Sequence, residues 1–137
     1  MAIVIDSSVA LEWILNQDRA EAAETVFRKP DDLLVHPLFW LEIAHVLVKQ
    51  RRLGVLTASQ RDQAWVELQN LSLTTLPGET AHALLPRVMV LADDHRLSAY
   101  DAAHLAAALH LSAELATLDM ALSAATLKAG GSLLSWT

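Results

Sequence analysis

Short aliphatic runs alternate with longer segments of helical periodicity along this chain, and this alternation constrains the fold more than any other feature. The first run, Ala2–Ile5, is rich in β-branched residues and is followed at once by Asp6. Later runs are closed by His36-Pro37 and by Pro77-Gly78. Because continuous apolar runs are typical of strands buried on both faces of a parallel sheet, we predict an α/β domain whose helices cover a mostly parallel sheet.

Capping and turn residues set the expected boundaries of the elements. Thr57 with Gln60, and Ser98 with Asp101, have the spacing of a capping box at the start of a helix. Pro86 is expected to interrupt another helix near its start. We predict about five strands, over residues 2–5, 33–35, 73–76, 115–117 and 132–136, and helices over residues 9–15, 18–29, 38–52, 57–71, 80–96, 98–110 and 119–129.

The 137 residues contain no linker-like stretch, so we expect a single domain over residues 1–137. The chain has no cysteine, which excludes a disulfide scaffold, a zinc–thiolate site and a thiol nucleophile. Its histidines do not show the His-x-x-x-His spacing of a zinc hydrolase. The N-terminus lacks the basic and apolar regions of an export signal, and no run approaches the roughly 20 apolar residues of a membrane span. We therefore expect a cytoplasmic protein.

The formal net charge of −6 is opposite in sign to that of most nucleic-acid-binding surfaces. A cation-binding site would account for part of this charge, because such a site gathers carboxylates and the bound ion reverses their field. Basic residues cluster at Lys49, Arg51 and Arg52, near the end of a predicted helix. We consider these three residues as possible RNA contacts, with a solvated helix end as the alternative.

Three aspartates are candidates for a site at the edge of the sheet. Asp6 and Asp119 follow the first and fourth predicted strands, and ligands of open parallel sheets bind beyond the carboxyl ends of the strands. Asp101 shares a mostly apolar helix face with Leu105, where a carboxylate is costly to bury unless it is paired or binds a metal. Each of these aspartates also has a simpler interpretation as part of a helix cap.

Glu42 lies at the margin of the apolar face of its predicted helix, on the same side as His45 and Lys49. From this margin it can reach a cleft between the helix and the sheet edge, and a pair with His45 is the alternative. Four carboxylates meeting in one site would repel one another unless a hard cation such as Mg²⁺ joined them. The chemistry that follows is metal-assisted hydrolysis, for which phosphate esters are matching substrates. Spacing alone does not establish that the four converge.

Four segments of the chain resemble the motifs of the PIN-domain nucleases, specifically the VapC-type toxins of bacterial toxin–antitoxin pairs. The segments are residues 3–11 around Asp6, 40–44 around Glu42, 98–108 around Asp101 and 115–122 around Asp119. They follow the family's order and rough spacing, and the resemblance covers nearly the whole chain. It implies a PIN-like three-layer sandwich, with the mostly parallel sheet between layers of helices.

The resemblance also implies an activity, a site and partners. The activity would be that of a metal-dependent endoribonuclease acting as the toxin of such a pair, on an RNA substrate that is often transfer RNA or ribosomal RNA. The implied partners are a VapB-like antitoxin, whose basic or apolar tail crosses the site, and a second copy in a homodimer. Asp6, Glu42, Asp101 and Asp119 would hold Mg²⁺ or Mn²⁺, and Ser8 and Thr117 would support them.

One position departs from the family pattern, and two other functional classes stay open. The family often has Asn three residues after the glutamate, where this chain has His45, which either orients Glu42 or water or is only a partly exposed helix residue. A phosphatase or phospho-acceptor with Asp6 as nucleophile is a second class, although Ser8 stands where such phosphatases have another Asp. A PIN-fold interaction module with weak catalysis is the third.

Overall fold

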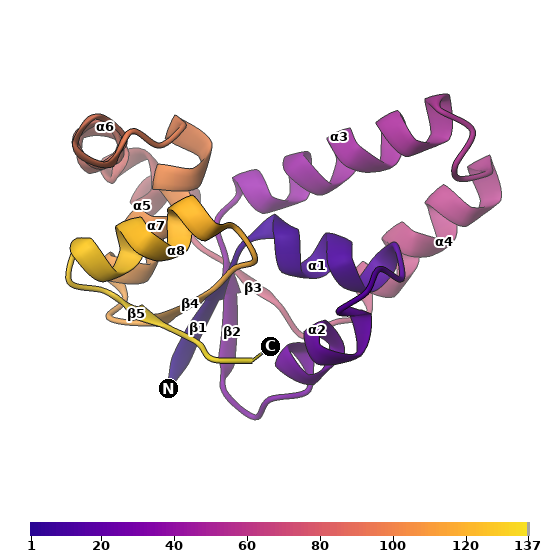
Figure 1. Cartoon of the computed structure of the whole chain (residues 1–137), viewed down its shortest axis with the longest axis horizontal. Helices are drawn as coiled ribbons and strands as arrows, with labels where there is room; N and C mark the ends of the chain where they lie inside the picture. Colours follow the sequence, from indigo (N-terminus) through magenta and orange to yellow (C-terminus); the bar gives the residue numbers. More distant parts are fainter. Residues whose placement is uncertain (137) are drawn as a thin grey trace.

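The computed structural model describes residues 1–136, so Thr137, the last residue of the predicted domain, lies outside the described residues. Strands and helices alternate along the chain as the sequence predicts (Figure 1). Within residues 1–136 the strands are β1 (Ala2–Ile5), β2 (Asp32–Val35), β3 (Thr74–Thr75), β4 (Glu114–Ala116) and β5 (Ser132–Leu133). The helices are α1 (Ser7–Ile14), α2 (Ala20–Phe27), α3 (Leu38–Arg52), α4 (Ala58–Gln69), α5 (Gly78–Ala83), α6 (Leu85–His95), α7 (Ala99–His110) and α8 (Met120–Lys128).

The five strands form one sheet in the order β3-β2-β1-β4-β5, and each neighbouring pair is parallel. β1 lies at the centre, where Ile3 pairs with Leu33 on one side and with Glu114 on the other. A central parallel strand is covered on both faces, which explains why the β1 sequence is continuously apolar. The predicted α/β fold with a mostly parallel sheet is confirmed.

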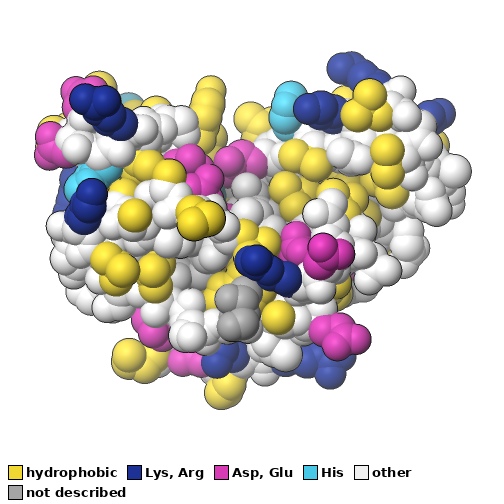
Figure 2. All heavy atoms as spheres, viewed as in Figure 1, with side chains coloured by type: hydrophobic (Ala, Val, Ile, Leu, Met, Phe, Trp, Pro, Cys, Tyr) yellow, Lys and Arg dark blue, Asp and Glu magenta, His cyan; other side chains and the backbone are white. Residues whose placement is uncertain are grey.

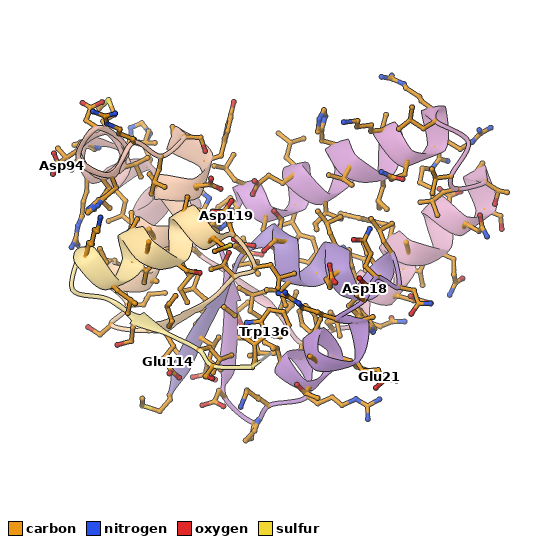
Figure 3. All side chains as sticks on the ribbon, viewed as in Figure 1. Asp18, Glu21, Asp94, Glu114, Asp119 and Trp136 are labelled. Carbon is orange, nitrogen blue, oxygen red and sulfur yellow. The ribbon has the colours of Figure 1, made fainter. Side chains whose placement is uncertain are left out.

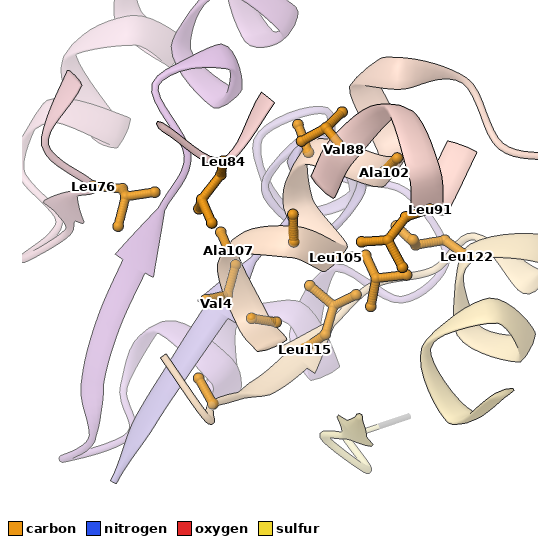
Figure 4. Packing of buried hydrophobic residues seen from close by; sticks show 14 of the residues in the cluster. Val4, Leu76, Leu84, Val88, Leu91, Ala102, Leu105, Ala107, Leu115 and Leu122 are labelled. Carbon is orange, nitrogen blue, oxygen red and sulfur yellow. The ribbon is translucent and has the colours of Figure 1, made fainter. Parts of the chain in front are cut away.

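The helices form two layers, one on each face of the sheet. Successive side chains of a strand point to opposite faces. Ile3 and Ile5 pack in one apolar cluster with α1, α2, α3 and α4, whereas Val4 packs in the other with α5, α6, α7 and α8. Figure 4 shows the second cluster, where Leu105 of α7 and Leu115 of β4 lie close to Val4. This arrangement is the three-layer sandwich that the sequence predicts.

Local signals place most element boundaries within a few residues of the prediction. The Thr57–Gln60 capping box is complete, with both of its hydrogen bonds present. The predicted helix over residues 80–96 is divided in two at Leu84, beside Pro86, because proline has no N–H to continue the ladder. The last predicted strand is shorter than expected, since the ladder ends with Leu133 and a final bond from the Leu134 N–H to the Leu115 carbonyl.

All five strands run in the same direction, so their carboxyl ends share one edge of the sheet. β1 leads into Asp6 and β4 into Thr117, while β2 leads into His36. α1, α3 and α8 begin beside this edge (Figure 1). Among residues 1–136, none of the helices is both long and apolar enough to cross a membrane.

Candidate active site

Asp6 follows β1 directly and is buried in a network of hydrogen bonds. Its side chain is 3% exposed, and its backbone N–H donates to the Ala116 carbonyl at 3.1 Å, continuing the pairing of β1 with β4. Oδ1 of Asp6 accepts hydrogen bonds from the backbone N–H of Ser8 at 2.6 Å and from its hydroxyl at 2.5 Å. Oδ2 accepts the Thr117 hydroxyl at 2.5 Å. Asp6 is therefore the N-cap of α1 and the centre of a polar network.

The same network fixes Asp119, which follows β4. The Ser8 hydroxyl accepts the Leu118 N–H at 2.9 Å, and the Thr117 hydroxyl accepts the Asp119 N–H at 3.0 Å. Oδ1 of Asp119 in turn accepts the Leu122 N–H at 2.8 Å and caps α8. Figure 3 labels Asp119 at the start of α8, at the end nearest to α1. Ser8 and Thr117 thus join the segments that follow β1 and β4, and the hydroxyls of both residues donate to the Asp6 carboxylate.

Asp101 lies in the first turn of α7. Its backbone N–H donates to the Ser98 hydroxyl at 3.1 Å. This is one half of the predicted capping box, and no bond from the Ser98 N–H back to the Asp101 carboxylate occurs in the described chain. Burial raises the pKa of Asp101 above its usual value, and the negative charges of Asp119 and Asp6 raise it further. Three aspartates therefore share one electrostatic environment: Asp6 and Asp119 follow β1 and β4, and Asp101 comes from the first turn of α7.

Glu42 approaches this environment from α3, on the other side of the sheet edge. Its Oε1 lies 2.6 Å from Nε2 of His104, a residue of α7. The Glu42 side chain is 26% exposed and that of His104 only 1%. The alternative pair with His45 is wrong, because His45 is exposed and makes no hydrogen bond to Glu42 among the bonds of residues 1–136.

The pKa values of the two buried histidines of the site are shifted in opposite directions. Burial disfavours the protonated form of His104, but the hydrogen bond that it donates to Glu42 and the charges of Asp6, Glu42 and Asp101 outweigh this cost and raise its pKa. The pKa of His36 is lowered to about 4, chiefly by burial and then by His104, against the pull of Glu42. Nδ1 of His36 accepts the Leu38 N–H at 3.0 Å, which requires that this nitrogen carry no proton.

Sequence reasoning did not select His36 or His104 as site residues. Each carried a signal, since His36 directly follows a strand at the edge of the sheet and His104 stands one helical turn after Asp101. Their ring centroids are 6.0 Å apart in an edge-on arrangement. The spacing of histidines along the chain could not identify this pair, because His36 follows β2 whereas His104 lies in α7.

The four candidate carboxylates do not surround a common point in this structure. Across residues 1–136, no three His, Asp or Glu side chains are arranged as a group that could hold a metal ion. Their chemistry nevertheless fits a hard cation, because every candidate ligand is a carboxylate oxygen. Asp6 uses three of the roughly four lone-pair sites of a carboxylate. Besides its burial, the negative charges of Asp119 and Asp6 raise the pKa of Asp101, and a cation would neutralise these charges.

A groove of about 750 Å³ opens beside Glu42 along α3. Apolar side chains such as Leu41 line much of it, and Ser7, His45, Arg52 and Tyr100 add polar groups. In Figure 2 acidic side chains gather in the hollow between α8 and α3, while basic side chains lie at the far end of α3. Of the three basic candidates, Arg52 lines this groove, whereas Lys49 and Arg51 are exposed on α3 outside its lining.

The model of the PIN domain family matches residues 3–127. The matched segment contains the whole sheet edge described above, from Asp6 to Asp119. The chain therefore belongs to the PIN-domain family, as its four sequence segments indicated.

Particular relatives are ribonuclease and toxin–antitoxin proteins. Ribonuclease VapC3 from Pyrobaculum aerophilum is 28% identical over 123 residues, which are 90% of this chain and 93% of that protein. The crystal structure of VapBC2 from Rickettsia felis, bound to a DNA fragment from their promoter, matches with a TM-score of 0.72, 11% identity and full coverage of both chains. The structure of VapC20 from Mycobacterium tuberculosis, a sarcin-ricin loop cleaving toxin, matches with a TM-score of 0.61, 16% identity and coverage of 90% and 94%.

Proposed function

We propose that this PIN-domain protein is a metal-dependent endoribonuclease and the toxin of a toxin–antitoxin pair. The observation that carries the proposal is the shared environment of Asp6, Asp101 and Asp119 at the carboxyl edge of the sheet, with Glu42 facing it from α3. The similarity to ribonuclease VapC3 supports the substrate class. RNA of the cytoplasm, transfer RNA or ribosomal RNA, would be the substrate.

The proposed cofactor is Mg²⁺, with Mn²⁺ as a substitute. Asp6, Glu42, Asp101 and Asp119 would hold it, since each presents oxygen atoms and hard divalent cations select oxygen. When bound, such a cation activates water as a nucleophile at neutral pH and stabilises the added charge of a phosphodiester transition state. The protein's own contribution is to keep the carboxylates oriented, through Ser8, Thr117 and the backbone of the two loops.

The groove beside Glu42 supports an RNA strand as the ligand that approaches the acids. Arg52 and His45 line it and can contact phosphate oxygens, while the exposed ring of Tyr100, next to Asp101, is available for stacking with a base. The net charge of −6 makes the basic groups few. We therefore expect an affinity for RNA that depends strongly on bound cation as well as on these residues.

The proposed partners are a VapB-like antitoxin and a second copy of this chain. The solved structures of similar fold include a toxin–antitoxin complex from Klebsiella pneumoniae. The same acidic hollow and apolar groove that would receive RNA would also suit a basic or apolar segment of an antitoxin. A tail bound there would exclude substrate.

Asp6 is poorly suited to the alternative role of a phosphatase nucleophile. Its side chain is 3% exposed, and both of its oxygens accept hydrogen bonds. A nucleophilic carboxylate must reach the phosphorus atom of its substrate, whereas Asp6 is buried and held in place by Ser8 and Thr117.

The proposal is tested by incubating purified protein, freed of any bound antitoxin, with total cellular RNA. The reactions contain Mg²⁺, Mn²⁺ or EDTA, and a parallel series uses the Asp101→Asn protein. We expect discrete fragments that require both the metal and Asp101. Wild-type protein that is free of antitoxin and leaves RNA intact with either metal would favour the interaction-module alternative.

A further inference from the structure

Two helices that contribute to the candidate site, α3 and α7, belong to opposite layers of the sandwich. α3 packs its buried residues Phe39, Ile43 and Leu47 in the cluster on one face of the sheet, and α7 packs Leu105 in the cluster on the other. The hydrogen bond between Glu42 and His104 crosses from one layer to the other. It joins residues that are 62 positions apart in the chain.

His104 has a polar environment that packing alone does not explain. The side chain is 1% exposed and sits in a helix whose other buried residues are alanines and a leucine. Its Nδ1 atom is buried without a hydrogen-bond partner among residues 1–136, so Glu42 is its single polar contact there. An unpaired buried polar atom costs free energy, and an apolar side chain of similar size would avoid this cost. Compared with an apolar side chain, His104 therefore lowers the stability of the fold, and it provides the contact with Glu42.

Glu42 depends on the same contact. Within residues 1–136 its carboxylate has His104 as its hydrogen-bond partner, at Oε1, and Oε2 takes part in none of the bonds found there. A glutamate side chain on a helix has several rotatable bonds, and ordering it costs conformational entropy. A fixed donor at Oε1 holds the carboxylate plane and leaves Oε2 available for a cation.

We propose that His104 is a positioning residue that holds Glu42 from the opposite layer of the sandwich, so that the carboxylates of Glu42 and Asp101 keep a fixed position relative to each other. This inference rests on the proposed metal-dependent function. α7 then contributes twice to the site: Asp101 presents its own carboxylate, and His104, three residues later, orients the carboxylate of the opposite helix. Groups that orient metal ligands in this way are a general requirement of metal sites.

His36 helps to position the start of α3, the helix that carries Glu42. It accepts the Leu38 N–H and so fixes the backbone at the start of α3, one turn before Glu42. Its ring meets the ring of His104 edge-on, with the centroids 6.0 Å apart. The chain of contacts His36–His104–Glu42 therefore begins and ends on the segment that carries the glutamate.

The test compares the Mn²⁺ affinity of variants that differ in whether the side chain can reach Glu42. In His104→Gln the amide nitrogen occupies the place of Nε2, whereas in His104→Asn the amide is too short and matches only Nδ1. His104→Leu removes the polar group at similar volume. His110→Leu, at an exposed position of the same helix, is the matched control. Each protein is titrated with Mn²⁺ alone by calorimetry, and its thermal unfolding is recorded separately.

We expect His104→Leu and His104→Asn to bind Mn²⁺ about 10- to 100-fold more weakly than wild type, the usual loss for a residue that orients a metal ligand. His104→Gln should retain affinity close to wild type, and His110→Leu should bind as wild type does. If His104→Leu does not fold, the comparison of the Gln and Asn variants decides, because both carry the same amide.

Two results would overturn the inference while leaving the proposed function intact. One is wild-type affinity in a folded His104→Leu protein. The other is an equal loss in the Gln, Asn and Leu variants that follows their melting temperatures, which would show a purely structural role. Wild-type protein that binds no Mn²⁺ would instead overturn the proposed metal site, and this inference with it.

Discussion

The two sides of the candidate site are built in different ways. On the sheet side, Asp6 and Asp119 are held by short loops whose hydroxyls and N–H groups form one connected network through Ser8 and Thr117. On the α3 side, the hydrogen bond with His104 is the one that holds the Glu42 carboxylate within residues 1–136. The first side is positioned by the backbone of two adjacent parallel strands, and the second by a side chain from the opposite layer. We therefore expect the first to be rigid and the second to be sensitive to its surroundings.

The largest expected effect is on catalysis. Replacement of Asp6 or Asp101 by Asn should lower RNA cleavage by more than about 100-fold, the upper end of losses caused by residues that only orient a ligand. The sheet side of the site and the first turn of α7 would then both be essential. The rate of cleavage of one defined RNA fragment at saturating Mg²⁺ is the measurement. Wild-type rates in the Asp101→Asn protein would count against the assigned ligand set.

Acid should weaken the α3 side through His36. Because the folded-state pKa of His36 is about 4, against an ordinary value of 6.5, the unfolded chain takes up a proton first as the pH falls. The stability that the neutral ring contributes is present above pH 6.5 and is lost as the pH falls toward 4, by roughly 3 kcal/mol. The raised pKa of His104 changes stability with pH in the opposite direction, so the pH dependence of wild-type stability does not isolate the effect of His36.

The His36→Asn variant isolates this effect, because Asn can still accept the Leu38 N–H but does not titrate. Chemical denaturation at pH 7 and pH 5 should show a smaller loss of unfolding free energy in the variant than in wild type. Equal losses in the two proteins would mean that His36 does not contribute to the acid sensitivity.

The sheet side should respond to the loss of one hydroxyl. Thr117→Val removes the donor to Asp6 and the acceptor for the Asp119 N–H, and should lower the free energy of unfolding by about 1–3 kcal/mol. Thr25→Val, at an exposed position on α2, is the control and should change it much less. Denaturant unfolding curves at pH 7 give both values.

The smallest expected effect is on the free energy of unfolding, which Asp101→Asn and Asp6→Asn should change in opposite directions. Asp101→Asn removes a charge that Asp119 and Asp6 repel, and should stabilise the protein by up to about 1 kcal/mol at neutral pH. Asp6→Asn replaces one of two accepting oxygens by an NH₂ group, so that either Thr117 or Ser8 loses its acceptor, and should destabilise the protein. Melting temperatures without added metal, changing in the same direction, would contradict this distinction.

Much of the fold could be predicted because each element carries its own local signal. Continuous apolar runs such as residues 2–5 indicate buried parallel strands, and Thr57 with Gln60 marks a helix start wherever the helix finally packs. Asp6 and Asp119 were placed at the sheet edge for the same reason, since each follows a strand. Boundaries such as the end of β5 were less accurate, because the strand ends where its neighbour does.

The sequence by itself therefore determined the order of the elements, the parallel sheet and the acids that follow its strands. Only the tertiary structure decided what Glu42 contacts, because His104 comes from another layer and His45, its near neighbour in sequence, is exposed on the helix surface. The structure also separated Arg52, which reaches the groove, from Lys49 and Arg51, which do not. Local interactions are encoded within a few residues, whereas contacts between distant segments arise only when the two helical layers pack on the same sheet.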